Sequence, residues 1–251
     1  MRLFKGVIHN NLSAPGLARR HSSQSFLELA VILPIILIML LGLVEVTVFV
    51  GRYLDLLDLT REAARFASVR DPFAPFSVSP NCSDPTSYNF YYSSACIFAP
   101  PIGSSACTGD PAFCGGLNPY ILVDSTTDDV IITAFTITKS GQVSAIHPSS
   151  PPWALSDHDL NTGSNANWTR NCDGEVVRSS PYYTSARVQA LLSSSADLST
   201  NRGYVAIEAY YCHSQVLGIP IISDFIGNPI QIHAYTIMSL PAAQPTPTPS
   251  N

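Results

Sequence analysis

The chain has 251 residues, of which 12% are charged, and its formal net charge is −5. A chain with so little positive charge has no basic surface for nucleic acid, so we expect no nucleic-acid partner. The length is enough for one modest domain with its own hydrophobic core.

Residues 1–23 are basic and contain no acidic residue. Their four cations, Arg2, Lys5, Arg19 and Arg20, are separated by Asn, Ser, Pro and Gly residues, a composition that predicts a disordered leader. Lys and Arg gather on the cytoplasmic side of membrane segments. The bias therefore predicts a cytoplasmic leader, with the chain beyond the next segment outside the membrane.

A long apolar segment follows the leader. The residues from Leu29 to Val50 would span roughly 33 Å as a helix, which is enough to cross a bilayer once. The segment has no polar face at a helical period, so it predicts a transmembrane helix in the lipid bilayer. Glu28 and Glu45 lie at its two ends, and Pro34 lies within it. A carboxylate at membrane depth is costly and marks a candidate functional residue.

The helix is expected to continue beyond the bilayer. Leu56, Leu59 and Ala63 recur at helical spacing, while charged residues line the other side. Pro72 disfavours a helix at the residue before it, so the predicted transmembrane and stem helix covers residues 24–70. The apolar side of the stem needs a partner, and we expect the following domain to supply it.

Residues 71–240 form the predicted extracytoplasmic domain. Its first part, residues 71–120, is rich in Pro, Ser, Tyr and Cys without a helix or strand period, so we expect long loops held by disulfides. The candidate cysteines are Cys82, Cys96, Cys107, Cys114, Cys172 and Cys212. Many pairings are open to them, and local pairs within residues 82–114 with a separate Cys172–Cys212 bridge would be economical.

The rest of the domain carries strand patterns, with β-branched and alternating apolar residues. The expected elements are strands at 130–138 and 143–146, a helix at 184–192, and strands at 204–211 and 231–240. This order predicts an α+β fold in which a small antiparallel sheet packs on the long N-terminal helix. Residues 241–251 are a Pro/Thr-rich tail that we expect to be extended.

The apolar segment also carries a family signature. The sequence QSFLELAVILP from Gln24 to Pro34, followed by Gly42-Leu-Val-Glu45, resembles the N-terminus of TadE/TadG-type pseudopilins. These are minor components of the tight-adherence (Flp-type) branch of type IV pilus systems. The resemblance covers about residues 19–70, and the two C-terminal strands resemble the family's paired terminal strands. Residues 71–182 carry no part of it.

The resemblance implies an assembly role for Glu28. The family has a small residue, usually Gly, before a leader cut, and this chain has Ser23 there. If the cut follows Ser23, the mature chain begins at Gln24 and Glu28 is its fifth residue. In pilin-like proteins that glutamate pairs with the N-terminal amine of a neighbouring subunit inside the membrane, which compensates its charge. The alternative for Glu28, and for Glu45, is a carboxylate that reaches water at the headgroups.

We expect no metal, no cofactor and no enzymatic activity. The cysteines and histidines lack the paired short spacings of zinc sites. The segment beginning at Asp157 partly resembles a calcium loop, but Thr162 stands where Gly is needed and Trp168 where Glu belongs, so a polar turn is favoured. The chain has no Gly-x-Ser-x-Gly, His-Glu-x-x-His or P-loop motif. Glu208, opposite tyrosines in a strand, is interpreted as a sheet or interface residue.

With the resemblance, these features predict a minor pseudopilin that acts in assembly or surface presentation of a tight-adherence pilus, and so in cell adhesion. It would be a single-pass protein of the cell membrane, incorporated into a pilus through its N-terminal helix. Its partners would be other pilin-like subunits. The alternative is a generic single-pass surface protein whose domain binds a ligand or the cell wall.

Overall fold

The computed structural model describes residues 21–74, 80–84, 86–108, 111–116, 120–124, 126–138, 140–158, 166–194, 202–218 and 227–240. The chain divides into two compact units, Met1–Val44 and Glu45–Asn251. Three expectations lie wholly or partly outside the described residues: most of the leader, the Pro/Thr-rich tail, and residues 159–165 of the calcium-like turn.

The long N-terminal helix is confirmed. Helix α1 covers His21–Ser68, 48 residues, and includes Pro34. It therefore contains the last residues of the expected leader and ends two residues before the expected boundary at residue 70. Beyond its end, the guanidinium of Arg70 donates to the carbonyl of Phe66 at 2.8 Å, which satisfies one of the carbonyls that the last turn leaves free.

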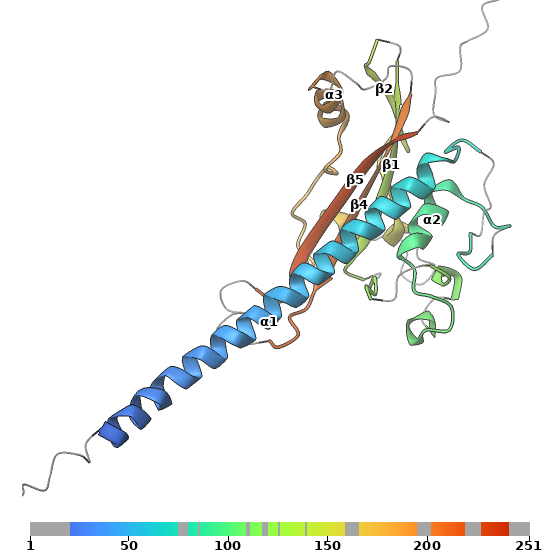
Figure 1. The fold of residues 1–251 in the computed structure, drawn as a ribbon. Helices are drawn as coiled ribbons and strands as arrows, with labels where there is room; N and C mark the ends of the chain where they lie inside the picture. Colours follow the sequence, from blue (N-terminus) through green and yellow to red (C-terminus); the bar gives the residue numbers. More distant parts are fainter. Residues whose placement is uncertain are drawn as a thin grey trace, which may run out of the picture. The chain divides into compact units, whose positions relative to one another are not determined.

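An antiparallel sheet forms the centre of the second unit. Its strands are β1 (Asp129–Ile137), β2 (Val143–His147), β3 (Trp153–Ala154), β4 (Gly203–His213) and β5 (Ile230–Leu240). The strand order is β2-β1-β4-β5, and β3 also pairs with β1 (Figure 1). The hairpin of β1 and β2 and the pairing of β4 with β5 match the predicted strands. The two residues of β3 are too few to produce a period.

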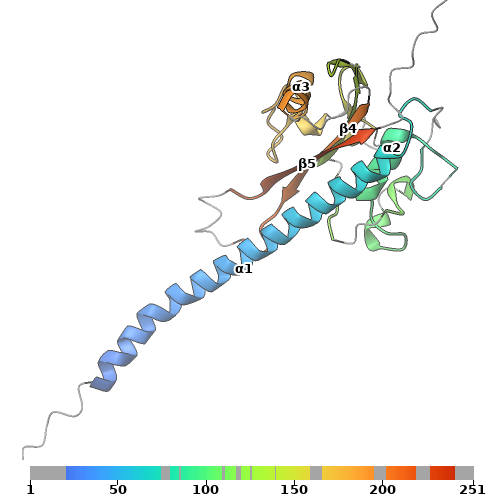
Figure 2. The same cartoon turned by 45° about the horizontal axis from the view of Figure 1, so that its top comes forward.

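The alternation along β4 divides the sheet into two faces. Val205, Ile207 and Ala209 point to the face covered by α1 and belong to the main core. Tyr204 and Ala206 point to the opposite face, where they pack with α3 (Ser185–Ser194) (Figures 1 and 2). The α1 residues at the centre of the main core are Leu56, Ala63, Ala64 and Ala67. The small alanines let the helix approach the sheet closely.

The region between α1 and β1 is built of loops, as predicted, but a short helix interrupts them. Helix α2 covers Phe90–Ala95 and begins after Asn89, whose side-chain oxygen accepts hydrogen bonds from the backbone N–H groups of Tyr91 and Tyr92. An Asn in this position stabilises a helix start. Six residues are too short to show a helical period, so the cap was the only local signal.

Candidate functional site

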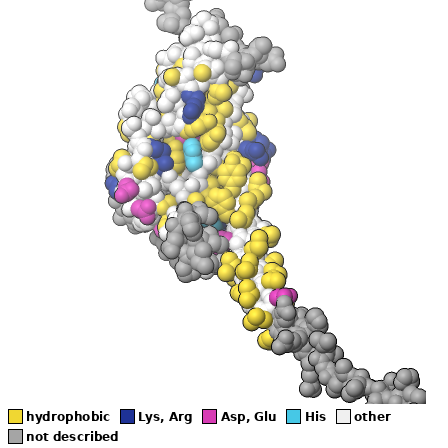
Figure 3. Space-filling view, turned by 90° about the vertical axis from the view of Figure 1, so that its left-hand side faces the viewer, with side chains coloured by type: hydrophobic (Ala, Val, Ile, Leu, Met, Phe, Trp, Pro, Cys, Tyr) yellow, Lys and Arg dark blue, Asp and Glu magenta, His cyan; other side chains and the backbone are white. Residues whose placement is uncertain are grey.

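The first unit consists, where it is described, of the apolar half of α1. Most of its large side chains are exposed, and Figure 3 shows them gathered along the helix. They are Phe26, Leu27, Leu29, Val31, Ile32, Leu33, Ile35, Ile36, Leu37, Ile38, Met39, Leu40, Leu41, Leu43 and Val44. Among the described residues, α1 is the one helix long and apolar enough to cross a membrane. A water-soluble helix would bury such side chains. With the disulfides, this surface suggests a membrane anchor and an extracytoplasmic domain.

Glu28 lies exposed within this apolar surface. Its carboxylate makes no hydrogen bond or ion pair with any part of the chain that the structure describes. Pro34 is exposed in the same stretch of α1, and the backbone of Ser23 and Gln24 forms the first turns of the helix. The four residues Glu28, Pro34, Ser23 and Gln24 thus lie on one element, α1.

Glu45 has a different environment, because it is buried. Its side chain is 7% exposed, and its two carboxylate oxygens accept hydrogen bonds from the backbone N–H groups of Val216 at 2.8 Å and Leu217 at 2.9 Å. These two residues follow β4, 171 and 172 residues further along the chain. Glu45 therefore attaches the β4–β5 connection to α1. No sequence pattern predicts this pairing, because backbone amides of a distant loop leave no mark on the residue types around Glu45.

The surroundings of Glu45 are partly aromatic and cationic. The ring of His213, at the end of β4, lies 5.9 Å from the ring of Phe49. Burial lowers the pKa of His213, the Glu45 carboxylate opposes this, and Arg52 lowers it further. Arg52 also donates to the carbonyl of Tyr120. Neutral His213 packs beside Phe49 of α1, and Glu45 of α1 binds the segment that follows β4, so both connect α1 to the sheet.

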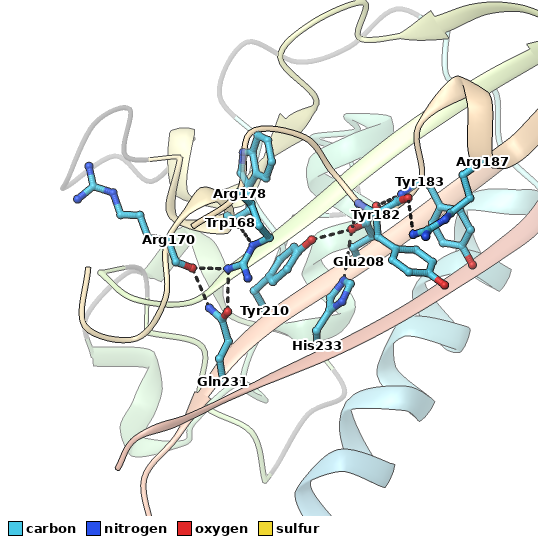
Figure 4. Close-up of polar contacts among 10 residues, drawn as sticks. All are labelled: Trp168, Arg170, Arg178, Tyr182, Tyr183, Arg187, Glu208, Tyr210, Gln231 and His233. Atoms are coloured by element: carbon cyan, nitrogen blue, oxygen red, sulfur yellow. Dashed lines mark hydrogen bonds and ion pairs between the residues drawn. The ribbon is translucent and has the colours of Figure 1, made fainter. Parts of the chain in front are cut away.

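A second buried carboxylate, Glu208 on β4, organises the other face of the sheet (Figure 4). It is 1% exposed and accepts hydrogen bonds from the backbone N–H groups of Tyr182 and Tyr183, both at 2.9 Å, and from the hydroxyl of Tyr210 at 2.8 Å. Nε2 of His233 lies 3.3 Å from the same carboxylate. Burial, and then the charge of Glu208, raise the pKa of Tyr210, so this hydroxyl stays protonated and donates. This arrangement fixes the segment before α3.

The same network continues through Arg178. Its guanidinium donates to the carbonyls of Trp168 and Arg170 and to the side chain of Gln231, and it lies over the ring of Tyr210 (Figure 4). The Trp168 and Gln231 bonds are 2.8 and 2.7 Å long. The guanidinium of Arg178 already has hydrogen-bond acceptors in the folded chain. We therefore interpret this polar cluster as a support for the loops and not as a reactive site.

Two adjacent aspartates support the loops at the start of β1. Asp129, 1% exposed, accepts from the backbone N–H groups of Ser156 and Trp168 at 3.0 and 2.9 Å. Asp128 accepts from the backbone N–H groups of Asp124 and Cys212 at 2.9 and 2.8 Å. Burial raises the pKa of each aspartate to about 6, although the hydrogen bonds oppose that change.

The six cysteines form three disulfides, Cys82–Cys96, Cys107–Cys114 and Cys172–Cys212. Two bridges are local to the loop region and one joins the loop before α3 to the end of β4. No group of three or more His, Cys, Asp or Glu side chains that could hold a metal ion occurs among the described residues.

Comparison with known proteins gives one match, and it falls on α1. Residues 24–65 match the model of the TadE-like protein family. No curated protein and no solved structure matches the chain. The match begins at Gln24 and covers the exposed apolar stretch, Glu28, Glu45 and most of the stem. The chain thus carries a TadE-like protein family domain at residues 24–65.

Proposed function

We propose that this chain is a membrane-anchored, non-enzymatic pilin-like subunit that takes part in the assembly or surface presentation of a tight-adherence pilus. The observation that carries the proposal is the coincidence of the TadE-like match at residues 24–65 with an apolar helix surface left exposed. In this proposal residues 1–23 are a cytoplasmic leader, 24–70 the transmembrane and stem helix, 71–240 the extracytoplasmic domain and 241–251 a tail.

The exposed stretch supports lateral assembly. Helices in a bilayer associate through close packing and polar pairs, because lipid tails are as apolar as the side chains. Glu28 is the one acid between residues 26 and 44. An unpaired carboxylate at membrane depth is costly, so a cationic partner is needed there. After a cut between Ser23 and Gln24, the N-terminal amine of a neighbouring subunit would be that partner.

Glu45 supports a depth of insertion in the bilayer, and the charges of the leader support an orientation. Its bonds to the amides of Val216 and Leu217 belong to the folded domain. In this proposal the bilayer segment ends before Glu45, and the basic residues of the leader support a cytoplasmic position for the other end. Residues 24–44 form a helix of roughly 31 Å, which still spans the hydrocarbon core.

The test is co-isolation of other pilin-like subunits from the native membrane with the full chain and with Glu28→Ala. We expect the amount of co-isolated subunits to fall at least tenfold in the variant, because the charge pair inside the membrane is removed. Glu62→Ala is the matched control, since Glu62 lies on the same helix, is partly exposed, and pairs with Arg65. It should co-isolate as the unaltered chain does.

The mass of the mature N-terminus completes this test. A chain beginning at Gln24 supports the amine pairing, whereas an intact Met1 excludes it. Unchanged co-isolation by Glu28→Ala together with an intact leader would contradict the assembly role. That result would favour a surface protein for which the helix is an anchor only.

A further inference from the structure

The outer face of the sheet, away from α1, contains a pocket with a volume of about 380 Å³. It lies between β1, β2, the segment 148–152, and the segment 179–186 that leads into α3. All of these segments are described and belong to one compact unit. Pockets of this size hold small organic molecules.

Hydroxyl-bearing side chains make up most of the polar lining of the pocket. They include Thr133, Ser149, Ser150, Ser179, Ser180 and Ser185. The serines at 149, 150, 179 and 180 are exposed, and no hydrogen bond from their hydroxyls occurs within the described residues. A hydroxyl is both donor and acceptor, so these groups are free to bind a ligand that is itself rich in hydroxyls.

The lining also favours a ligand without a net charge. None of the residues around the pocket is Asp, Glu, Lys, Arg or His. Arg178 and Arg187 are each one residue from the lining, and both are engaged elsewhere. Arg178 donates to the carbonyls of Trp168 and Arg170. Arg187 lies over the ring of Tyr182, and Glu208 is enclosed by its own hydrogen bonds. An ionic ligand would therefore lose its hydration without gaining an opposite charge, whereas a neutral ligand would not.

Aromatic and apolar side chains complete the site. Trp168 and Tyr183 line the pocket together with prolines of the two flanking segments. Trp168 is 4% exposed, and its Nε1 has no hydrogen-bond partner in the described part of the chain. Its backbone is fixed by Asp129 and Arg178, so the indole is held in place before any ligand arrives. A rigid ring beside free hydroxyls suits a molecule with both C–H faces and hydroxyls.

We propose that this pocket binds a neutral saccharide unit, either a free sugar or one residue of a glycan. The proposal goes beyond the pilus role and stands without it, because it rests only on the pocket of the folded domain. Free hydroxyls of the serines bind the sugar hydroxyls, and Trp168 and Tyr183 pack against its C–H groups. A single sugar has few atoms to contribute, so we expect a Kd on the order of 1 mM.

The test uses the full chain with 5-fluorotryptophan at both tryptophans, in nanodiscs or in a detergent without a sugar headgroup. Fluorine NMR then reports Trp153 and Trp168 separately, with assignment by Trp168→Phe. The probes are glucose, galactose, mannose and N-acetylglucosamine, the disaccharides maltose and cellobiose, and glucuronate. We expect at least one neutral sugar to shift the Trp168 signal with saturation. The Trp153 signal should not move, because Trp153 packs among Tyr91, Tyr92 and His158 away from this pocket.

Two variants make the outcome specific. Ser180→Leu fills the pocket and should raise the apparent Kd at least tenfold. Ser193→Leu makes the same change at an exposed position of α3 outside the pocket, and should leave the titration unchanged. Tighter binding of a disaccharide than of its monosaccharide would identify a glycan chain as the source. The proposal is overturned if no neutral sugar moves the Trp168 signal, if glucuronate binds better than glucose, or if Ser180→Leu binds as the unaltered chain does.

Discussion

Buried carboxylates of the domain share one task, which is to bind backbone amides of distant loops. Among the described residues, Glu45, Glu208 and Asp129 each accept hydrogen bonds from two backbone N–H groups far along the chain. Asp128 accepts one such bond, from Cys212, and a second from Asp124 in its own turn. A hydrogen bond to a charged acceptor is stronger than one between neutral groups. Because loops have few apolar contacts of their own, these acids replace a packed core where the chain is irregular.

The first residue-level prediction concerns Glu45. Glu45→Ala leaves the amides of Val216 and Leu217 without an acceptor, which costs about 2–4 kcal/mol locally. We expect hydrogen exchange in a peptide covering residues 214–218 to become at least tenfold faster, measured by mass spectrometry on the full chain in detergent.

Glu45→Gln keeps one acceptor oxygen and should give an intermediate rate. Glu62→Ala, which removes a partly exposed acid of the same helix, should not change the exchange of that peptide. Equal exchange in Glu45→Ala and the unaltered chain would show that the amides are held by something other than this carboxylate.

The second residue-level prediction concerns pH. The pKa of Asp129 is raised in the folded chain to about 6 from its ordinary value of 3.8. The folded state therefore binds a proton more readily than the unfolded state, and the associated stability is present at low pH and lost as the pH rises through about 6. The free energy of unfolding should increase when the pH is lowered from 7 to 5, with about 1 kcal/mol from this group.

Thermal unfolding of the full chain at the two pH values measures this effect. Asp129→Asn should be less stable at both, since its amide cannot accept from all the donors, and it should show a smaller gain at pH 5. An equal gain in the variant would assign the pH dependence to other acids, such as Asp128.

At the scale of elements, periodic segments were predictable and short or irregular ones were not. Helix α1 and strands β1, β4 and β5 each repeat apolar residues over nine residues or more. The alternation of β4 predicted a strand, and the structure shows which face packs on α1. Helix α2 and strand β3 are too short to repeat. Their positions depend on the Asn89 cap and on pairing with β1, and pairing is a tertiary contact that a local pattern does not contain.

The disulfides give a prediction at this scale. Removing Cys172–Cys212, whose cysteines have a sequence separation of 40, should lower the free energy of unfolding by about 4 kcal/mol. Removing Cys107–Cys114, with a separation of 7, should lower it by about 2 kcal/mol, because a short loop constrains the unfolded chain less.

Double Cys→Ser variants of each pair, unfolded thermally in the same detergent, measure this order. Each pair serves as the control for the other, since both variants lose the same number of cysteines. A larger loss from the Cys107–Cys114 pair would show that native contacts around that bridge, rather than the loop length, determine its effect.

At the scale of the whole chain, the anchor was predictable from sequence and the pocket was not. An uncharged run of apolar residues predicts a helix in lipid whatever follows it. The pocket combines residues from positions 133 to 186, on two strands and two loops, and none of them is unusual in its own segment. Glu45 was recognisable in the sequence as an acid at the end of the apolar segment. Its partners were not predictable, because they lie 171 and 172 residues further along the chain.

The disulfide pattern has a consequence for how the chain is made. Each of the three bridges joins cysteines that follow one another along the sequence, with separations of 14, 7 and 40 residues. When the chain is exported in order, each cysteine that appears second meets only one unpaired thiol, and that thiol is its native partner. Oxidation in order of appearance gives the correct set, so for a domain translocated in this order we expect a thiol oxidase to be sufficient without a disulfide isomerase.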